Sequence, residues 1–403
     1  MGVDVPVTVR TSTASLLARQ EDVTEAWSPA TPRIMGVGTA VAGECYSQQE
    51  LLDIFRITDP KVRSVFFGSA IGRRYLTLPD VDAHGLRMNE GQGELLGKHT
   101  RVATAMGGQA LTECLKDAGA DMGDIKHLCC VTSTGFLTPG LSALLIRQLG
   151  ISPACSRADI VGMGCNGGLN ALNVVAGWAV AHPRQLAVML CAEACSAAYV
   201  FDGTMRTAIV NSLFGDGGAA IALIADGPGG GASGGEASAD GPDGRPDAAA
   251  GGTGAGAGAR ILSVASRIIT DAFDAMRYDW DREQGKFSFF LDPEIPYVVG
   301  AHVTAVIDQL VSAAGLRRSD IRHWLVHSGG KKVIDAVVIN LGLTDYDLRH
   351  TIGVLRDYGN LSSGSFLFSY QRLLRDGVTS LGDYGVMMTM GPGSTIEAAL
   401  IQW

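Results

Sequence analysis

Long apolar runs, rather than alternating apolar and polar residues, mark most of the expected strands. Leu186–Cys191 and Ala219–Ile224 are almost wholly apolar, and another strand begins at Arg33. Such runs are typical of sheets that helices cover on both faces. Ser47-Gln-Gln-Glu matches the capping-box pattern and predicts a helix that continues through Phe55. The patterning therefore predicts an α/β protein whose strands are buried between helices.

An internal repeat occurs twice, about half a chain apart. Ala118–His127 contains the end of a helix, a glycine stop and an Asp-Ile pair before an apolar strand, and Ala314–His323 has the same order. This similarity predicts a duplicated α/β architecture. We expect an arm over 1–33, one half over 34–226 and a second half over 260–403.

The segment between these halves, residues 227–259, is dominated by glycine, with alanine, aspartate, proline and serine. It holds too little apolar surface for burial to offset the entropy of ordering it. We interpret it as a flexible surface insertion between two strands.

Composition narrows the function classes. The chain has 403 residues, 46% of them apolar and 18% charged, and its net charge is −9. A large core is expected, and nucleic-acid binding is disfavoured because phosphate contacts need a basic footprint. No apolar run approaches the roughly 20 residues of a membrane span, and residues 1–33 lack the apolar segment of a secretory signal. We therefore expect a cytoplasmic protein without nucleic-acid or membrane partners.

The eight cysteines do not indicate metal binding or disulfides. No two are spaced as a CxxC pair, and no histidine cluster lies near them. Structural zinc and a disulfide framework are therefore disfavoured. We expect most of these cysteines to be buried thiols.

Cys165 is the exception among them. It follows the apolar strand end Asp159–Val161 in the turn Gly162-Met-Gly-Cys165, and the apolar helix pattern of Leu169–Val180 comes next. Glycines permit a tight turn and close approach of a ligand. A helix N-terminus favours a thiolate, so Cys165 is a candidate nucleophile.

Two further turns carry polar residues of the types that acyl transfer uses. His327 ends an apolar strand and precedes Ser-Gly-Gly-Lys-Lys, and Asn360 lies in Tyr358-Gly-Asn-Leu-Ser-Ser before a helix. Alone, such a histidine is often structural, and an asparagine before a helix is often an N-cap. Together with Cys165, each on a glycine-lined turn, they fit cysteine-dependent acyl transfer.

With Leu213-Phe-Gly-Asp-Gly and Met390-Gly-Pro-Gly-Ser-Thr-Ile-Glu, these motifs resemble the type III polyketide synthases, of the chalcone synthase type, among the thiolase-fold condensing enzymes. The resemblance runs from about residue 33 to the end, apart from the glycine-rich insertion. It implies a thiolase-like five-layered αβαβα fold from two duplicated halves, a homodimer, malonyl-CoA as substrate and no cofactor.

The resemblance also implies roles for individual residues. Cys165 would be the catalytic nucleophile, and His327 and Asn360 would stabilise the enolate of decarboxylated malonyl-CoA, with His327 also lowering the pKa of the Cys165 thiol. Phe214 and Phe289 would be gatekeeping aromatics. The remaining pocket residues implied are Thr132, Thr138 (in a loop that crosses to the dimer partner), Cys195, Ala198, Ser362, Met390, Gly391 and Pro392. Lys61 and Arg63 correspond to the family's basic CoA-binding helix, and we expect Lys331 and Lys332, beside the His327 turn, to add to CoA binding.

Within that family, Gly164–Trp178 and Cys191–Tyr199 resemble the bacterial synthases of 3,5-dihydroxyphenylacetyl-CoA in glycopeptide-antibiotic pathways. Ser328 and Met390 depart from the plant-type pattern. The resemblance implies four malonyl-CoA as starter and extenders. A malonyl starter ends in a carboxylate, which is costly to bury without partners, so we expect the hydroxyls of Thr132, Ser196 and Ser362 near it. The alternatives are a different acyl-CoA starter, an enzyme like β-ketoacyl-acyl-carrier-protein synthase III, and a non-catalytic partner subunit.

We predict that deleting residues 229–256 leaves turnover and melting temperature nearly unchanged, because shortening a flexible loop alters its closure entropy only slowly. Calorimetry and a product assay on the deleted and full-length chains would measure both. A large loss of either would show that the segment packs on the body or covers the site.

Overall fold

The computed structural model describes residues 25–26, 31–198, 203–227 and 258–403. Almost all of the predicted insertion over 227–259, and most of the predicted arm over 1–33, lie outside these residues.

The first half contributes five neighbouring strands to the main sheet. Their order is β2 (Pro32–Val41), β8 (Gly217–Ala225), β7 (Leu186–Glu193), β5 (Ile125–Val131) and β6 (Ser156–Ile160). The first two pairings are antiparallel and the last two are parallel.

The second half repeats this arrangement. Its order is β9 (Arg260–Ile268), β14 (Thr395–Gln402), β13 (Tyr384–Gly391) and β12 (Ile321–Val326), with two antiparallel pairings and then a parallel one. β2 and β9 meet at a single antiparallel register pair, which joins the halves into one sheet. The predicted duplication is thus confirmed by strand order and pairing direction.

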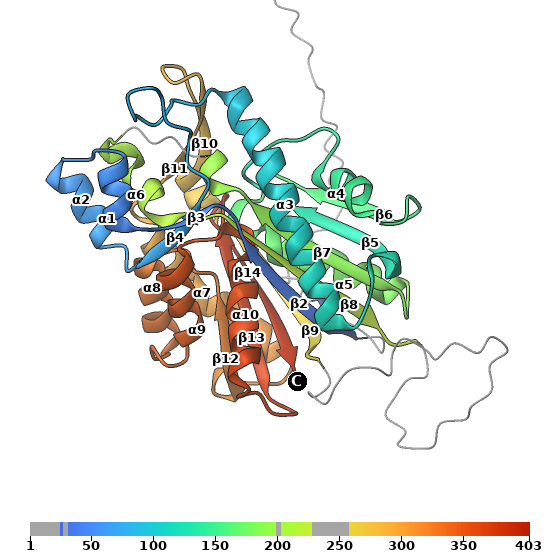
Figure 1. Ribbon diagram of the computed structural model, residues 1–403. Coiled ribbons are helices and arrows are strands. Elements are labelled where there is room, and N and C mark those ends of the chain that lie inside the picture. Colours follow the sequence, from blue (N-terminus) through green and yellow to red (C-terminus); the bar gives the residue numbers. More distant parts are fainter. Residues whose placement is uncertain (1–24, 27–30, 199–202, 228–257) are drawn as a thin grey trace, which may run out of the picture.

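Helices form three layers around these strands (Figure 1). Apolar α5, which contacts strands of both halves, lies in the central layer with α10, as expected of a helix with apolar residues all round. The outer layers lie on opposite sides, and the five-layered α/β fold is confirmed. The helices are α3 (Gln92–Ala118) and α4 (Leu141–Leu149) outside the first half, α5 (Gly167–Ala181) and α10 (Ser365–Asp376) in the centre, and α7 (Ile295–Ala313) and α8 (Lys331–Leu341) outside the second.

Shorter elements complete the described chain. The predicted capping box is present at α1, where the Ser47 backbone N–H donates to Glu50 Oε2 over 2.7 Å. The helices are α1 (Gln48–Ile54), α2 (Pro60–Phe67), α6 (Met205–Leu213), α9 (Arg349–Tyr358) and the 3-10 helices η1 (Met122–Asp124), η2 (Gly164–Asn166), η3 (Cys195–Ala197), η4 (Thr270–Ala275), η5 (Arg318–Asp320) and η6 (Ser362–Gly364). The strands are β1 (Glu25–Ala26), β3 (Glu44–Ser47), β4 (Arg73–Leu76), β10 (Met276–Asp281) and β11 (Lys286–Leu291).

Helix α7 is a borderline case for the expectation that no apolar run is long enough to span a membrane. Among the described residues, α7 alone is long and apolar enough to cross a membrane, by length and composition. It packs against α8, β9 and β14, and Val303, Ile307 and Leu310 on it are fully buried. Its apolar residues therefore belong to the core.

The two central helices begin against each other. A Cβ built on Gly168, in the first turn of α5, would lie 2.2 Å from the carbonyl oxygen of Ser363, just before α10. It would also lie 2.7 Å from the Phe366 ring. Only glycine allows this approach, which sets the distance between the starts of the two helices.

We predict that Gly168→Ala lowers the free energy of unfolding by about 3 kcal/mol, because the added methyl overpacks a contact with backbone. Gly97→Ala on α3 is the matched control, since its Cβ meets only the end of the Arg101 side chain, 3.9 Å away. That control should keep or slightly raise stability. Urea denaturation of both variants measures the difference, and equal stabilities would contradict the proposed packing.

Candidate active site

Cys165 lies in the turn that the sequence predicted. β6 ends at Ile160, the 3-10 turn η2 contains Cys165, and α5 follows directly. Gly162 and Gly164 have φ of 79° and 58°, in the region that favours glycine. Pro392 packs so closely that a Cβ on Gly164 would lie 2.4 Å from its Cδ. The glycines are therefore needed to place Cys165 at the start of α5.

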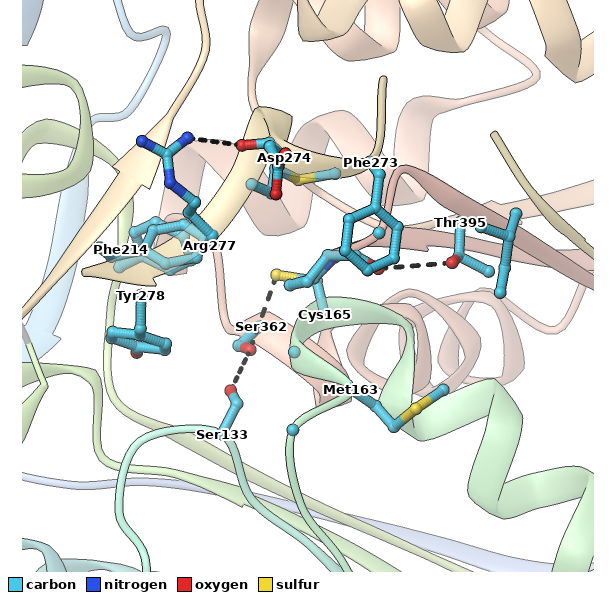
Figure 2. Close-up of a pocket in the computed structure, with 17 residues that line it drawn as sticks. Ser133, Met163, Cys165, Phe214, Phe273, Asp274, Arg277, Tyr278, Ser362 and Thr395 are labelled. Atoms are coloured by element: carbon cyan, nitrogen blue, oxygen red, sulfur yellow. Dashed lines mark hydrogen bonds between the residues drawn. The ribbon is translucent and has the colours of Figure 1, made fainter. Parts of the chain in front are cut away.

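Ser362 faces Cys165 from the start of α10. The Cys165 thiol donates to Ser362 Oγ over 3.6 Å, and Ser362 Oγ lies 3.2 Å from Ser133 Oγ (Figure 2). Ser362 has φ of 50°, a strained value for a residue with a side chain. Its backbone N–H donates to Asn360 Oδ1 over 2.8 Å, which holds it in that conformation.

A buried carboxylate lies behind these hydroxyls. Glu193, at the end of β7, is fully buried. Ser363 Oγ donates to it over 2.6 Å, the Ser133 N–H over 2.9 Å and Ser362 Oγ over 3.3 Å. Burial raises the pKa of Glu193, and these hydrogen bonds oppose the rise. The sequence analysis missed Glu193 and Ser133. The sequence did contain a signal for Glu193, because it is an acidic residue at the end of an otherwise apolar strand. Charged residues are rarely buried without partners, so such a residue indicates a polar site.

Asn360 is held by its backbone as well as by its side chain. Its N–H donates to Leu213 O over 2.8 Å, and its carbonyl accepts from the Gly215 N–H over 3.0 Å. These bonds place Asn360 beside Phe214. Its amide Nδ2 donates to Gly329 O over 3.4 Å, two residues beyond His327.

His327 follows the last residue of β12, and its side chain is 2% exposed. Its N–H donates to Met388 O over 2.7 Å, and its Nδ1 is hydrogen-bonded to Ser365 Oγ. Burial lowers the pKa of His327 to about 3, so its imidazole is neutral near pH 7. The three predicted residues Cys165, His327 and Asn360 are thus linked through the starts of α5 and α10.

The expected effect of His327 on the thiol is not found. Burial raises the pKa of Cys165 to about 12, and hydrogen bonds with Ser362 and Asn360 offset this only in part. A neutral imidazole provides no positive charge to stabilise a thiolate. Burial therefore favours a neutral Cys165 thiol in the unliganded site.

Cys165 opens onto a cavity of about 420 Å³, within the usual range for sites of small organic ligands. Phe214 and Phe289 meet edge to face in its wall, with ring centroids 6.0 Å apart. Arg74 Nη1 donates to the Phe214 carbonyl over 2.7 Å and fixes that residue from behind. The lining residues are Ser133, Gly162, Met163, Gly164, Cys165, Phe214, Ile268, Phe273, Asp274, Met276, Arg277, Tyr278, Phe289, Ser362, Pro392, Gly393 and Thr395 (Figure 2).

Four of the implied pocket residues line this cavity, namely Phe214, Phe289, Ser362 and Pro392. The others do not. Cys195 is fully buried, Met390 is 4% exposed, and Gly391 passes so close that a Cβ would lie 2.2 Å from Asn166 Oδ1. Ala198 is half-buried and packs against the same apolar cluster as Cys165, and Thr138 lies on the surface.

Two of the hydroxyls implied for a starter carboxylate are already engaged. Thr132 is buried beside Thr134, while its neighbour Ser133 lines the cavity. Ser196 Oγ donates to the buried carboxylate of Asp216 over 2.6 Å. Ser133, rather than Thr132 or Ser196, is the hydroxyl that joins Ser362 in lining the cavity.

The four basic residues implied for CoA binding lie at the starts of α2 and α8, outside the cavity lining. Arg63 donates to Ile57 O over 3.0 Å, and Lys331 Nζ pairs with Asp335 over 2.5 Å. Lys61 and Lys332 are exposed. Their role in binding CoA stays a prediction. The basic residue that does line the cavity is Arg277, which donates to Asp274 O over 2.7 Å.

The other cysteines behave largely as expected. All eight are free thiols, and only Cys45 is exposed. Among the described residues, no group of three or more His, Cys, Asp or Glu could hold a metal ion.

Comparison with known proteins gives one consistent result. Residues 20–228 match the N-terminal domain of chalcone and stilbene synthases, and residues 266–403 match the C-terminal domain. The chain is 64% identical to a 3,5-dihydroxyphenylacetyl-CoA synthase of Streptomyces toyocaensis over 411 residues, covering 100% of both. It is 66% identical to one of Amycolatopsis orientalis, covering 92% of the chain and 93% of the relative. The crystal structure of PKS-I from Ectocarpus siliculosus superposes with a TM-score of 0.81 at 23% identity, covering 94% of this chain and 100% of that one.

We predict that alkylation of Cys165 by iodoacetamide still accelerates between about pH 9 and pH 10, because the thiol pKa of about 12 leaves little thiolate below that range. Peptide mass spectrometry would follow the labelling of Cys165, with exposed Cys45 as internal reference and Cys165→Ser as the blank. A rate that levels off below pH 7 would show instead that His327 and Cys165 form an ion pair.

Proposed function

This chain belongs to the chalcone and stilbene synthase family of type III polyketide synthases, and from that premise we propose that it condenses four malonyl-CoA into 3,5-dihydroxyphenylacetyl-CoA or the free acid. The observation that carries the proposal is the identity of 64% and 66% with two such synthases over nearly their whole lengths. The cavity at Cys165 agrees with it, since it is of a size to hold a short chain during ring closure.

In the loading step, Cys165 Sγ attacks the thioester carbonyl of the starter malonyl-CoA. A C–S bond to Cys165 forms and the bond to the CoA sulfur breaks. The thiol proton leaves along the hydrogen bonds to Ser362 and then Glu193, and it is returned to CoA, which leaves as a thiol. The raised pKa of Glu193 favours this transient protonation.

In each extension, a second malonyl-CoA binds with its thioester oxygen toward His327 and Asn360. Carbon dioxide leaves, and the electron pair of the broken C–C bond forms an enolate. Donors fixed at that oxygen before the reaction stabilise its charge, and loss of one such donor typically costs about 10²–10³ in rate. The enolate carbon then attacks the acyl group on Cys165, and the Cys165 thiolate leaves, so that the extended chain is now a CoA thioester. Cys165 attacks that thioester in turn, CoA leaves as a thiol, and the chain is again on Cys165 for the next cycle.

The carbon balance agrees with a malonyl starter. Four malonyl units supply the eight carbons of the product once four molecules of carbon dioxide have left. Ring closure between a methylene and a ketone, with loss of water, yields the aromatic ring. Every step is redox-neutral, so the reaction as proposed requires no cofactor, and malonyl-CoA is a substrate only.

The rival interpretations are less well supported. A β-ketoacyl-acyl-carrier-protein synthase is disfavoured because the matched family models cover both halves of the chain. A non-catalytic subunit would not need Cys165, His327 and Asn360 together at one site. A different acyl-CoA starter remains the alternative that the experiment below decides.

We also propose a homodimer in the cytoplasm. The segment between β5 and α4 supports the dimer, since Phe136 is 73% exposed and Thr138 beside it is exposed as well. An exposed aromatic ring leaves water when a partner subunit covers it, which favours association. On this proposal, Thr138 would meet the partner subunit rather than its own cavity.

We predict that purified protein supplied with malonyl-CoA alone releases the dihydroxyphenylacetyl product, measured by mass spectrometry. Cys165→Ala should form no product, because no acyl thioester can form, yet should still decarboxylate malonyl-CoA through His327 and Asn360. Strict dependence on an added acyl-CoA starter would overturn the malonyl-primed reaction and leave only the family assignment. Full product from Cys165→Ala would overturn the mechanism.

A further inference from the structure

Arg74, in β4, is a buried cation that holds part of the cavity wall from behind. The residue is only 1% exposed. Its Nη1 donates to the Phe214 carbonyl over 2.7 Å, and its Nη2 donates to Gln48 Oε1 over 2.9 Å. Gln48 is fixed in turn, because its Nε2 donates to Ser212 O over 2.7 Å. The rigid fork of the guanidinium therefore ties the backbone of Phe214 to α1 and the end of α6.

A buried anion lies close to this cation in the Leu213-Phe-Gly-Asp-Gly motif. Asp216 is fully buried, and its two oxygens accept from both polar groups of Ser196. The Ser196 N–H donates to Oδ1 over 2.8 Å, and Ser196 Oγ donates to Oδ2 over 2.6 Å. Ser196 belongs to η3, whose Cys195 packs in the same apolar cluster as Cys165. Asp216 therefore fixes the turn η3 beside the site.

The two groups carry opposite charges along the same strand. The Asp216 N–H donates to Tyr75 O over 2.8 Å, and the Thr77 N–H donates to Asp216 Oδ2 over 3.0 Å. Asp216 thus lies against the residues that directly follow Arg74 in β4. Burial lowers the pKa of Arg74 to about 9, and the charge of Asp216 is among those that oppose the fall, so Arg74 is cationic near pH 7. A buried charge is costly unless an opposite charge compensates it.

We propose that Arg74 and Asp216 form a buried pair of opposite charges that positions Phe214 and the turn η3, and thereby sets how many malonyl units the chain takes before release. Neither residue lines the cavity, so both are positioning residues that act through the parts of the site they hold. The inference rests on the proposed function for the identity of the product. It goes beyond that function by naming residues behind the cavity wall that determine product length.

The stem of Arg74 also reaches the segment that carries Asn360. Gly359 has φ of 75°, and a Cβ on it would lie 2.9 Å from Arg74 Cδ. Phe214 and Asn360 are paired as an isolated parallel bridge, and the Gly215 N–H donates to the Asn360 carbonyl. Arg74 therefore packs against the backbone that places both Phe214 and Asn360 at one edge of the cavity.

The charge pairing can be tested without substrate by urea denaturation. Arg74→Met and Asp216→Asn each leave one buried charge without its counter-charge, so each should lower the urea midpoint. The double variant removes both charges and should lose clearly less stability than the sum of the two single losses. Losses that simply add would overturn the pairing.

The effect on product length is measured by incubating the enzyme with malonyl-CoA and determining the ratio of the four-unit product to products of all other lengths. A merely structural role would lower the total yield without changing this ratio, because unfolded enzyme makes no product. Arg74→Met should lower the ratio roughly 10–100-fold, since a small displacement of a positioned group can cost this much. An unchanged ratio would overturn the proposed control of product length.

Lys98→Met is the matched control, because Lys98 is another buried cation, paired with Glu90 on a different part of the chain. It should keep the wild-type ratio even where it lowers stability, and a shift equal to that of Arg74→Met would overturn the proposal. Should Arg74→Met not fold, Arg74→Lys takes its place. Lysine keeps the charge but lacks the fork that holds Phe214 and Gln48 together, so a wild-type ratio from Arg74→Lys would also overturn it.

Failure of the proposed function gives a different result. In that case the wild-type enzyme would release no dihydroxyphenylacetyl product from malonyl-CoA. The denaturation experiment would still decide whether Arg74 and Asp216 are paired, which separates the two failures.

Discussion

The close approach of the two central helices is the constraint on which the site depends. Gly168 at the start of α5 lies against the backbone of Ser363, just before α10, with no room for a methyl group between them. Cys165 precedes the first helix and Ser362 precedes the second, so their contact follows from this packing. The positive ends of two helix dipoles also meet at this point, which suits an enolate that carries its charge only during the reaction.

Burial at the starts of α5 and α10 affects two groups, the Cys165 thiol and the Glu193 carboxylate. The field of two helix N-termini acts over a single turn, whereas desolvation acts on the whole thiol. For Cys165, desolvation is the largest cause of its pKa shift, and the pKa of the thiol rises. The hydroxyls of Ser133, Ser362 and Ser363 donate hydrogen bonds to the buried carboxylate of Glu193 and stabilise it. Hydrogen bonds thus run from the Cys165 thiol to Ser362 and from Ser362 to Glu193, which is the path of the thiol proton in the proposed loading step.

The sequence predicted those parts of the site that depend on local order along the chain. The turn at Cys165, the strand end at His327 and the repeat that relates β5 to β12 are all present, because glycine conformation and apolar runs act over a few residues. The direction in which a side chain points within a turn was harder to predict from the sequence. Thr132 and Ser133 are adjacent, yet only Ser133 faces the cavity, and consecutive residues of an extended segment point to opposite sides. The role of Glu193 depends on hydroxyls from the other half, which no local pattern reveals.

The duplication explains why these residues meet. β5 and β12 occupy equivalent positions in the two halves, and so do the turns before α5 and α10. The equivalent strand ends supply Ser133 in one half and His327 in the other, while the equivalent helix starts supply Cys165 and Ser362. Each half thus brings the end of a strand close to the start of a helix. Because the halves pack around α5 and α10, the residues from both halves meet at one site. Different side chains at the equivalent turns then separate the proposed nucleophile from the donors proposed to stabilise the enolate.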